Sequence, residues 1–234
     1  DGHERPELLE EAEYALPELN RENLPGADLI AAGGCNATAT LLGLLPLYED
    51  GILTGDEQIV VDVKVGSSEG GATGSAASHH AERSGIVRPY APTSHRHEAE
   101  IEAYLGARVA FTVHAVDMIR GASATCHVFP DSPVSKGDLW GAYRETYDDE
   151  PFVRMAAGGG TVYRYPEPKA VAGSNFAEVG FELDPRNGRV VVFSAIDNMM
   201  KGSAGQAVHA ANVALGFEET AGLSFTGFHP VGAP

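Results

Sequence analysis

Residues 28–42 read Asp-Leu-Ile-Ala-Ala-Gly-Gly-Cys-Asn-Ala-Thr-Ala-Thr-Leu-Leu, and their order predicts a strand, a tight turn and a helix. The apolar run 29–32 is typical of a short strand, and the glycine pair 33–34 allows the chain to turn tightly. A helix is predicted to begin at Cys35, because apolar residues recur at helical spacing from Ala37 to Tyr48. The stretch therefore places a cysteine in the first turn of a helix.

A cysteine in this position is a candidate nucleophile. Free N–H groups and the positive end of the helix dipole favour thiolate over thiol, and the two glycines leave room for a substrate. A small buried residue that only packs at the start of a helix would fit the same sequence. The other cysteine, Cys126, lies in a stretch of alternating apolar residues and is predicted to be packed in the core.

The remaining pattern predicts an α+β fold. Residues 1–27 are charged and interrupted by prolines, with helical pieces at most, and residues 66–76 form a loop rich in glycine and serine. Because several strands follow one another without helices, the sheet is expected to be antiparallel or mixed. The predicted strands are 58–65, 109–116, 122–129, 179–183 and 190–196, and the further predicted helices are 94–105, 135–147 and 201–215.

The composition excludes several classes of partner. The chain has 33 acidic and 16 basic residues, a net charge of −17, and this field repels nucleic acid and anionic membranes. No apolar run reaches the length of a membrane span, and two cysteines cannot build a disulfide framework, so we expect the reducing cytoplasm. An acidic surface with few lysines suggests adaptation to high intracellular salt, although an ordinary acidic protein fits as well.

A histidine segment at 95–101 supplies a second set of candidates. His95 precedes the predicted helix, where an imidazole can act as general acid/base for a thiol, and Glu100 could hold that ring in one tautomer. His97 falls on the apolar side of the helix and is expected to be structural. His95 could also be an ordinary loop histidine. A zinc site is a further alternative, in which His95 and His97 would act with His79, His80 and Cys35. No typical ligand spacing supports it.

A third segment, residues 197–206, leads into the last predicted helix. The Asn198 amide and the Lys201 ammonium, with the free N–H groups of the helix, suit an anion or a carboxamide. Small residues chosen for close packing at a helix entry would produce the same pattern.

The segments fit the motifs of one enzyme family, in order and over nearly the whole chain. They are Tyr-Ala-Leu-Pro-Glu-Leu-Asn (14–20), Gly-Cys-Asn-Ala-Thr (34–38), His-Arg-His-Glu-Ala-Glu-Ile (95–101), Met-Ile-Arg-Gly (118–121), Gly-Ser-Asn (173–175) and Asp-Asn-Met-Met-Lys-Gly-Ser-Ala-Gly-Gln (197–206). Together they resemble the N-acetyl-γ-glutamyl-phosphate reductases and their relatives in lysine biosynthesis.

The resemblance implies an NADPH-dependent oxidoreductase that reduces an acyl phosphate to a semialdehyde through a cysteine thioester. It also implies roles for individual residues. Cys35 would be the nucleophile, His95 the acid/base and Glu100 its support; Ser67, Gly70 and Asn198 would line the nicotinamide side of the NADPH site; and Arg120 is a candidate clamp for the substrate phosphate. A structural salt bridge would account for Arg120 equally well.

The resemblance also implies a domain organisation. Family members usually begin with a dinucleotide-binding half that carries a glycine-rich turn, and that half is not in this sequence. We therefore expect a remnant of the N-terminal Rossmann-type cofactor domain at 1–34, a catalytic and dimerisation domain at 35–196, and a C-terminal helix returning to the cofactor domain at 197–234. On this view the chain is truncated, binds NADPH weakly or not at all by itself, and belongs to a homodimer or homotetramer.

The turn at 33–36 distinguishes two branches of the family. Enzymes of the arginine pathway usually have Asn-Pro-Gly-Cys followed by an aromatic residue, whereas this chain has Gly-Gly-Cys-Asn. The Cys-Asn-Ala-Thr form resembles the branch whose aminoadipate or glutamate phosphate is attached to a small acidic amino-group carrier protein. The choice between these acyl groups, and an N-acetylated substrate, remain open at this point.

A docking surface for an acidic carrier is predicted at 79–97. This segment contains Arg83, Arg88 and Arg96 and one acid, Glu82, in a chain that is acidic overall. The alternative is that the arginines pair with neighbouring carboxylates and brace the loop. Two rival functions are a papain-like hydrolase or acyltransferase, whose other signatures are missing, and a fragment without activity of its own.

Overall fold

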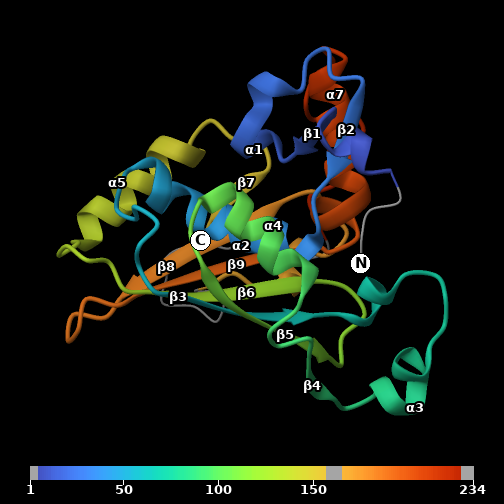
Figure 1. Ribbon diagram of the computed structural model, residues 1–234, viewed down its shortest axis with the longest axis horizontal. Helices are drawn as coiled ribbons and strands as arrows, with labels where there is room; N and C mark the ends of the chain where they lie inside the picture. The colour runs from blue at the N-terminus through green and yellow to red at the C-terminus, as the bar shows by residue number, and fades with distance from the viewer. Residues whose placement is uncertain (1–4, 157–164, 228–234) are drawn as a thin grey trace.

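The computed structural model describes residues 5–156 and 165–227, and its main feature is a seven-stranded mixed sheet covered by helices on one face (Figure 1). The strand order is β4-β5-β3-β6-β9-β8-β7. The strands are β3 (Ile59–Val65), β4 (Val87–Tyr90), β5 (Val109–Val116), β6 (Ala122–Val128), β7 (Val153–Met155), β8 (Ala177–Leu183) and β9 (Val190–Ile196). The helices over the sheet are α2 (Cys35–Glu49), α4 (Arg96–Leu105) and α5 (Lys136–Tyr147).

The pairing of the strands makes the sheet mixed. β3 pairs in parallel with β5 and antiparallel with β6, and β7 pairs in parallel with β8. Buried and half-buried residues alternate along β3, β5 and β6, because one face packs on the helices and the other is not covered by them. The predicted α+β class is confirmed. Of the two sheet types expected, antiparallel or mixed, the chain forms a mixed sheet.

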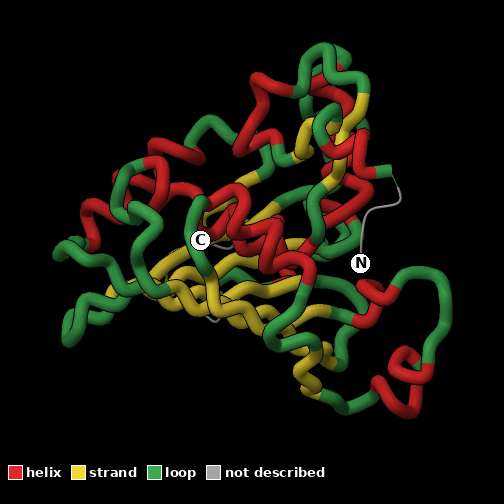
Figure 2. The backbone as a smooth tube through the Cα atoms, in the orientation of Figure 1, coloured by secondary structure: helices red, strands yellow, loops and turns green. Residues whose placement is uncertain are grey.

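Helix α2 is the centre of the core. Every residue from 36 to 47 is buried, because the helix lies between the sheet and the helices α4 and α5. The hydroxyls of Tyr143 and Tyr147 on α5 donate hydrogen bonds to the carbonyls of Gly43 and Leu42 at 2.5 and 2.6 Å. A helix with a single apolar face was expected here, whereas the observed helix is buried around its whole circumference from residue 36 to 47. Figure 2 shows the longer helices in red gathered on one side of the yellow strands.

A small second layer forms beside the sheet from both ends of the chain. It contains β1 (Ala12–Ala15), β2 (Leu29–Ala32), α1 (Pro17–Asn20) and α7 (Gly205–Ala214), which lie together at the top of Figure 1. β1 and β2 form a two-stranded parallel sheet, and Ala15 and Leu24 pack against Ala210 of α7. The expectation of helical pieces at most in residues 1–27 was wrong at β1, because a four-residue strand that pairs with a distant segment leaves too short a pattern to recognise.

The remaining elements are short helical turns of three to five residues. They are η1 (Pro6–Leu9), η2 (Arg21–Asn23), η3 (Ser67–Gly70), η4 (Ala76–Ser78), α3 (His80–Arg83) and α6 (Pro168–Val171). The predicted last helix is divided in two: η5 (Met200–Ala204) has π-helical hydrogen bonding, and α7 continues from it. This π-helical turn lies beside Cys35. Such turns are often found at functional sites.

Candidate active site

A cavity of about 430 Å³ lies at the N-terminus of α2. Four segments that are far apart in the sequence line it, namely the turn from β2 to α2, the η3 loop, the start of α4 and the entry to η5. The residues include Gly34, Cys35, Ser68, Glu69, Arg96, His97, Glu100, Asn198, Gly202 and Ser203. The fold thus joins the three segments that the sequence singled out around one thiol.

Cys35 is the first residue of α2, as predicted, and Gly34 is its N-cap. A Cβ on Gly202 would lie 2.6 Å from the Cys35 Cβ, so only glycine allows η5 to approach the thiol this closely. Burial and the negative Glu69 raise the pKa of Cys35 to about 11, although backbone N–H groups and Arg96 act in the other direction. This direction is opposite to the stabilised thiolate expected from the sequence, because burial outweighs the helix N-terminus.

The imidazole that contacts the cysteine turn belongs to His97. A Cβ on Gly34 would overlap the His97 ring, and His97 is only 4% exposed. Arg96 Nε donates to His97 Nε2 at 3.4 Å, and His97 Nδ1 is buried without a hydrogen-bond partner in the described part of the chain. Burial, together with His95 and Arg96, lowers the pKa of His97 to about 3, so the ring is neutral at pH 7.

His95 lies next to His97 but does not line the cavity. Its Nδ1 accepts a hydrogen bond from the His97 backbone N–H at 3.2 Å, which makes His95 the N-cap of α4. Its ring packs between Tyr90, Phe111 and His97, and burial lowers its pKa. The sequence could have indicated His97 as the closer ring, since the apolar side of α4 faces the core from which Cys35 projects.

Glu100 supports the cysteine turn and not a histidine ring. Its Oε1 accepts hydrogen bonds from the Tyr14 hydroxyl at 2.5 Å and from the Gly34 N–H at 2.8 Å. Burial raises the pKa of Glu100, while the hydrogen bonds from Tyr14 and Gly34 oppose that shift. Tyr14 comes from β1 and stacks on Tyr104 of α4, so a strand of the second layer helps to fix the residue before Cys35.

Asn198 lines the cavity, whereas Ser67 and Gly70 are not among the residues that line it. The Asn198 side chain bonds within the protein: Nδ2 donates to Ser68 Oγ at 2.9 Å, and Oδ1 accepts from the Gly121 N–H at 2.7 Å. The η3 loop meets the cavity instead through Ser68, Glu69 and Gly71. Asn198 therefore holds this loop against the end of β9.

The arginines predicted to bind the phosphate or the carrier differ from one another in their charge partners. Arg120 forms an ion pair with the fully buried Asp197 at 3.2 Å, which is the salt-bridge alternative. Arg83 lies 3.6 Å from Glu69 and Arg88 lies 3.5 Å from Glu82, so both have carboxylate neighbours near the lobe around α3. Arg96 is exposed and lines the cavity.

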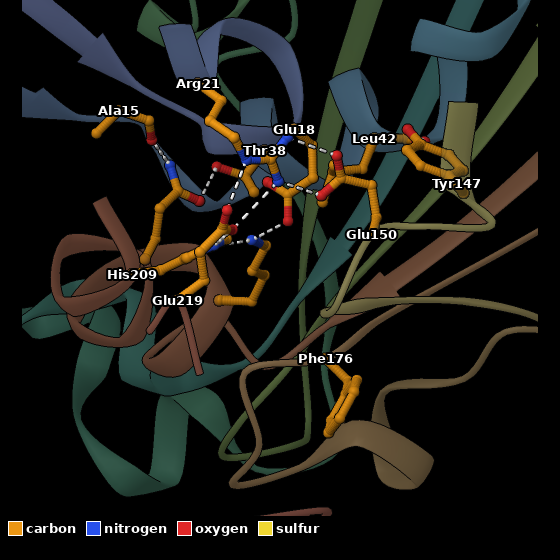
Figure 3. A network of polar contacts seen from close by, with 12 residues as sticks. Ala15, Glu18, Arg21, Thr38, Leu42, Tyr147, Glu150, Phe176, His209 and Glu219 are labelled. Atoms are coloured by element: carbon orange, nitrogen blue, oxygen red, sulfur yellow. Dashed lines mark hydrogen bonds and ion pairs between the residues drawn. The ribbon is translucent and has the colours of Figure 1, made fainter. Parts of the chain in front are cut away.

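A charge network that the sequence did not reveal joins α1 to the last helix, and its centre is buried (Figure 3). Lys201 and Glu18 are both 0% exposed and 2.5 Å apart, and Lys201 Nζ also lies 3.3 Å from His209 Nδ1. His209 continues to Glu219, which pairs with Arg21, and Arg21 makes a two-pronged ion pair with Glu150. Lys201 was expected to suit an anion from outside, but its partner is a carboxylate of the chain itself.

In residues 5–156 and 165–227, no group of three or more histidines, cysteines and acids is arranged to hold a metal ion. None of the helices in that part of the chain is long and apolar enough to cross a membrane.

Comparison with known proteins connects this geometry with one family. Residues 35–198 match the family model described as "Semialdehyde dehydrogenase, dimerisation domain". Proteins from Natronomonas pharaonis and Haloarcula marismortui, both named LysW-L-2-aminoadipate/LysW-L-glutamate phosphate reductase, are 79% and 81% identical over 100% of this chain and 68% of their own length. A protein from Thermomicrobium roseum, named LysW-L-2-aminoadipate 6-phosphate reductase, is 48% identical over 98% of the chain and 67% of its own length.

Solved structures agree on the fold. Aspartate semialdehyde dehydrogenase II from Vibrio cholerae has a TM-score of 0.69 at 17% identity, covering 88% of this chain and 69% of that one. A probable aspartate-semialdehyde dehydrogenase from Pseudomonas aeruginosa has a TM-score of 0.64 at 20% identity, covering 87% and 68%. The chain therefore belongs to the family of these phosphate reductases and carries its semialdehyde dehydrogenase dimerisation domain.

Proposed function

We propose that this chain is the catalytic module of an NADPH-dependent reductase. Its substrate would be aminoadipate 6-phosphate or glutamate 5-phosphate attached to a small acidic carrier protein, and its product the semialdehyde, in lysine or arginine biosynthesis. The observation that carries the proposal is Cys35, which begins α2 at a cavity of about 430 Å³ shared with His97, Arg96 and Glu100. The names of the relatives in Natronomonas and Haloarcula support the choice of substrate.

The first chemical step is acyl transfer to the thiol. Cys35 Sγ attacks the acyl carbon, the bond from that carbon to the phosphate oxygen breaks, and a thioester forms. The pKa of Cys35 is raised to about 11, so the thiol holds its proton at pH 7 and must lose it during the attack. The neutral His97 ring adjoins the turn and is the group we propose to handle this proton, with His95 fixing the backbone of the same helix turn.

The second step needs a hydride, which NADPH would supply when bound. The nicotinamide would lie against Ser68 and Gly71 of the η3 loop and Ser203 of η5, whose small side chains border the cavity. A Cβ on Gly71 would meet no atom within 4 Å, so this border has space for a flat ring. Asn198 would keep η3 in place through Ser68.

Carrier docking and assembly follow from two surfaces. Arg83 and Arg88 already have carboxylate neighbours, so we propose that the carrier approaches along the cavity mouth at Arg96 and not along the α3 lobe. Among residues 5–156 and 165–227, the helices α2, α4 and α5 all lie on one face of the sheet (Figure 1), and we propose that the opposite face is covered in a homodimer or homotetramer. The family name of the domain supports that assembly.

The test is turnover by an enzyme in which this chain follows the N-terminal part found in the relatives. NADPH oxidation should require the carrier-linked acyl phosphate and should be lost in Cys35→Ser, with circular dichroism unchanged. An active serine variant would contradict the role of Cys35. Equal turnover of a free N-acetylated glutamyl phosphate would assign the chain to the arginine-pathway reductases instead.

A further inference from the structure

We infer that Arg96 binds the phosphate group of the acyl phosphate while that group leaves. The inference rests on the proposed function and assigns a phosphate site to a residue that the sequence had linked only with carrier docking. Among the described residues that line the cavity, Arg96 is the only lysine or arginine.

The position of Arg96 suits this task. It is the first residue of α4, on the wall of the cavity that holds Cys35, and it is exposed to the solvent that fills the cavity. Its Nε donates to His97 Nε2 at 3.4 Å, which orients the guanidinium and leaves its two terminal nitrogens for a ligand. No ion pair to Arg96 occurs among residues 5–156 and 165–227.

The acids of the cavity already have partners. Glu69 accepts a hydrogen bond from the Tyr90 hydroxyl at 2.7 Å and lies 3.6 Å from Arg83. Glu100 accepts from Tyr14 and Gly34. Neither carboxylate forms an ion pair with Arg96 within the described part of the chain, so the guanidinium can accept an incoming anion.

The other cations that could bind the phosphate already form ion pairs with buried carboxylates. Arg120 pairs with the buried Asp197 at 3.2 Å, and Lys201 pairs with the buried Glu18 at 2.5 Å. Removing either cation from its partner would leave a carboxylate buried without a charge partner. The His97 ring on the wall of the same cavity is 4% exposed, and its Nδ1 has no hydrogen-bond partner in the described part of the chain.

The chemistry balances without a further reagent. The Sγ–carbon bond forms, the carbon–oxygen bond to phosphorus breaks, and the electron pair leaves on the phosphate oxygen. The thiol proton, which the His97 ring takes up during the attack, ends on the phosphate, which departs as HPO₄²⁻. A planar guanidinium fork matches two phosphate oxygens and stabilises the charge that grows on the leaving oxygen, so its effect is larger in the transition state.

The experiment uses this chain alone and two acetyl donors that give the same S-acetyl product. Acetyl phosphate leaves as phosphate, whereas p-nitrophenyl acetate has a leaving group without phosphate. Acetylation of Cys35 is followed by intact mass and peptide mapping, which separates it from Cys126. The variants are Arg96→Met, Arg96→Lys, the competitor Arg120→Met and the matched control Arg186→Met, at an exposed hairpin far from the cavity.

We expect Arg96→Met to lower the acetylation rate with acetyl phosphate by about 30- to 100-fold, and the rate with p-nitrophenyl acetate by less than about threefold. Arg96→Lys should recover part of the loss, because a point charge replaces the fork. Inorganic phosphate should slow alkylation of Cys35 in the unmodified chain but not in Arg96→Met. Arg120→Met and Arg186→Met should keep the ratio of the two rates.

Two outcomes separate this inference from the proposed function. If Cys35 is acetylated and Arg96→Met keeps the rate ratio, or Arg120→Met changes it instead, the role of Arg96 is overturned and the proposed reaction stands. If neither donor acetylates Cys35 in the unmodified chain, the proposed function is overturned together with this inference.

Discussion

The network around Lys201 and the cavity around Cys35 both adjoin the π-helical turn η5, and they differ in how far their charged groups are paired. At Lys201 every charged group has a close partner: Glu18, His209, Glu219, Arg21 and Glu150 form one chain of contacts (Figure 3). At Cys35 the thiol has a raised pKa, His97 Nδ1 has no partner in the described residues, and Arg96 faces a cavity.

The difference separates groups that stabilise the fold from groups that are available for a ligand. Burial raises the pKa of Glu18, but the positive Lys201 and the neighbouring His209 outweigh it, and the pKa is lowered overall. Burial and the negative Glu69 raise the pKa of Cys35, and the opposing backbone N–H groups and Arg96 do not outweigh them. Charges that pair with one another hold η5 in place, and the groups of the cavity that lack such partners are those we expect to meet substrate.

The largest effect should come from breaking the network. Lys201→Met leaves Glu18 buried without its cation, which should lower the free energy of unfolding by about 3–5 kcal/mol. The measurement is urea denaturation in molar KCl. The double variant Lys201→Met with Glu18→Gln should recover part of the loss, and an unchanged stability in the single variant would contradict the view that the pair is structural.

The second effect distinguishes the two histidines of the cavity wall. In the full-length enzyme, His97→Asn should lower kcat by about 100-fold, because the ring that contacts the cysteine turn is lost. His95→Asn should cost less, since asparagine can still cap α4. Steady-state rates of NADPH oxidation provide the test. A greater loss in His95→Asn would restore His95 as the acid/base.

The third effect is on the titration of Cys35. The thiolate is the reactive form, and a pKa of about 11 means that its fraction rises about tenfold per pH unit below that value. Iodoacetamide labelling of Cys35 should therefore increase about 100-fold from pH 7 to pH 9 and continue to increase at pH 10. Cys126, fully buried with a pKa of about 12, is the internal control and should react more slowly. A plateau for Cys35 below pH 8 would mean that the site stabilises thiolate after all.

The smallest effect is that of salt. Surface carboxylates repel one another in a chain of net charge −17, so the melting temperature should rise by about 5 °C from 0.1 to 2 M KCl. The buried pair is shielded from ions, and the stability lost in Lys201→Met should be the same at both salt concentrations. A flat melting temperature would contradict the adaptation to salt, and a salt-dependent loss would show that ions reach the pair.

The sequence predicted most elements that carry a long, regular pattern. β5 and β9 begin and end at the predicted residues, and α2 begins at Cys35, because alternation and helical spacing are clear there. It missed β1, β4 and β7, which have three or four residues each and depend on pairing with distant strands.

The site was predictable in its segments but not in its contacts. The family motifs identified Cys35, Glu100 and Asn198, and all three line the cavity. Whether His95 or His97 approaches the thiol depends on how α4 is rotated against α2, and the state of Cys35 depends on burial by η5. Neither quantity is encoded in local spacing, and the partner of Lys201 is 183 residues away in sequence.

The contact between Tyr14 and Glu100 has a consequence for recombining these enzymes. The family model begins at Cys35, which suggests a natural point to join the cofactor half of one relative to the catalytic half of another. Yet Tyr14, on the far side of that point, donates to the same carboxylate oxygen that holds the N–H of Gly34. A chimera joined at residue 34 would take β1, which carries Tyr14, from one parent and α4, which carries Glu100, from the other. The workable junction lies ahead of residue 12, where β1 begins, so that strand, turn and helix are inherited together.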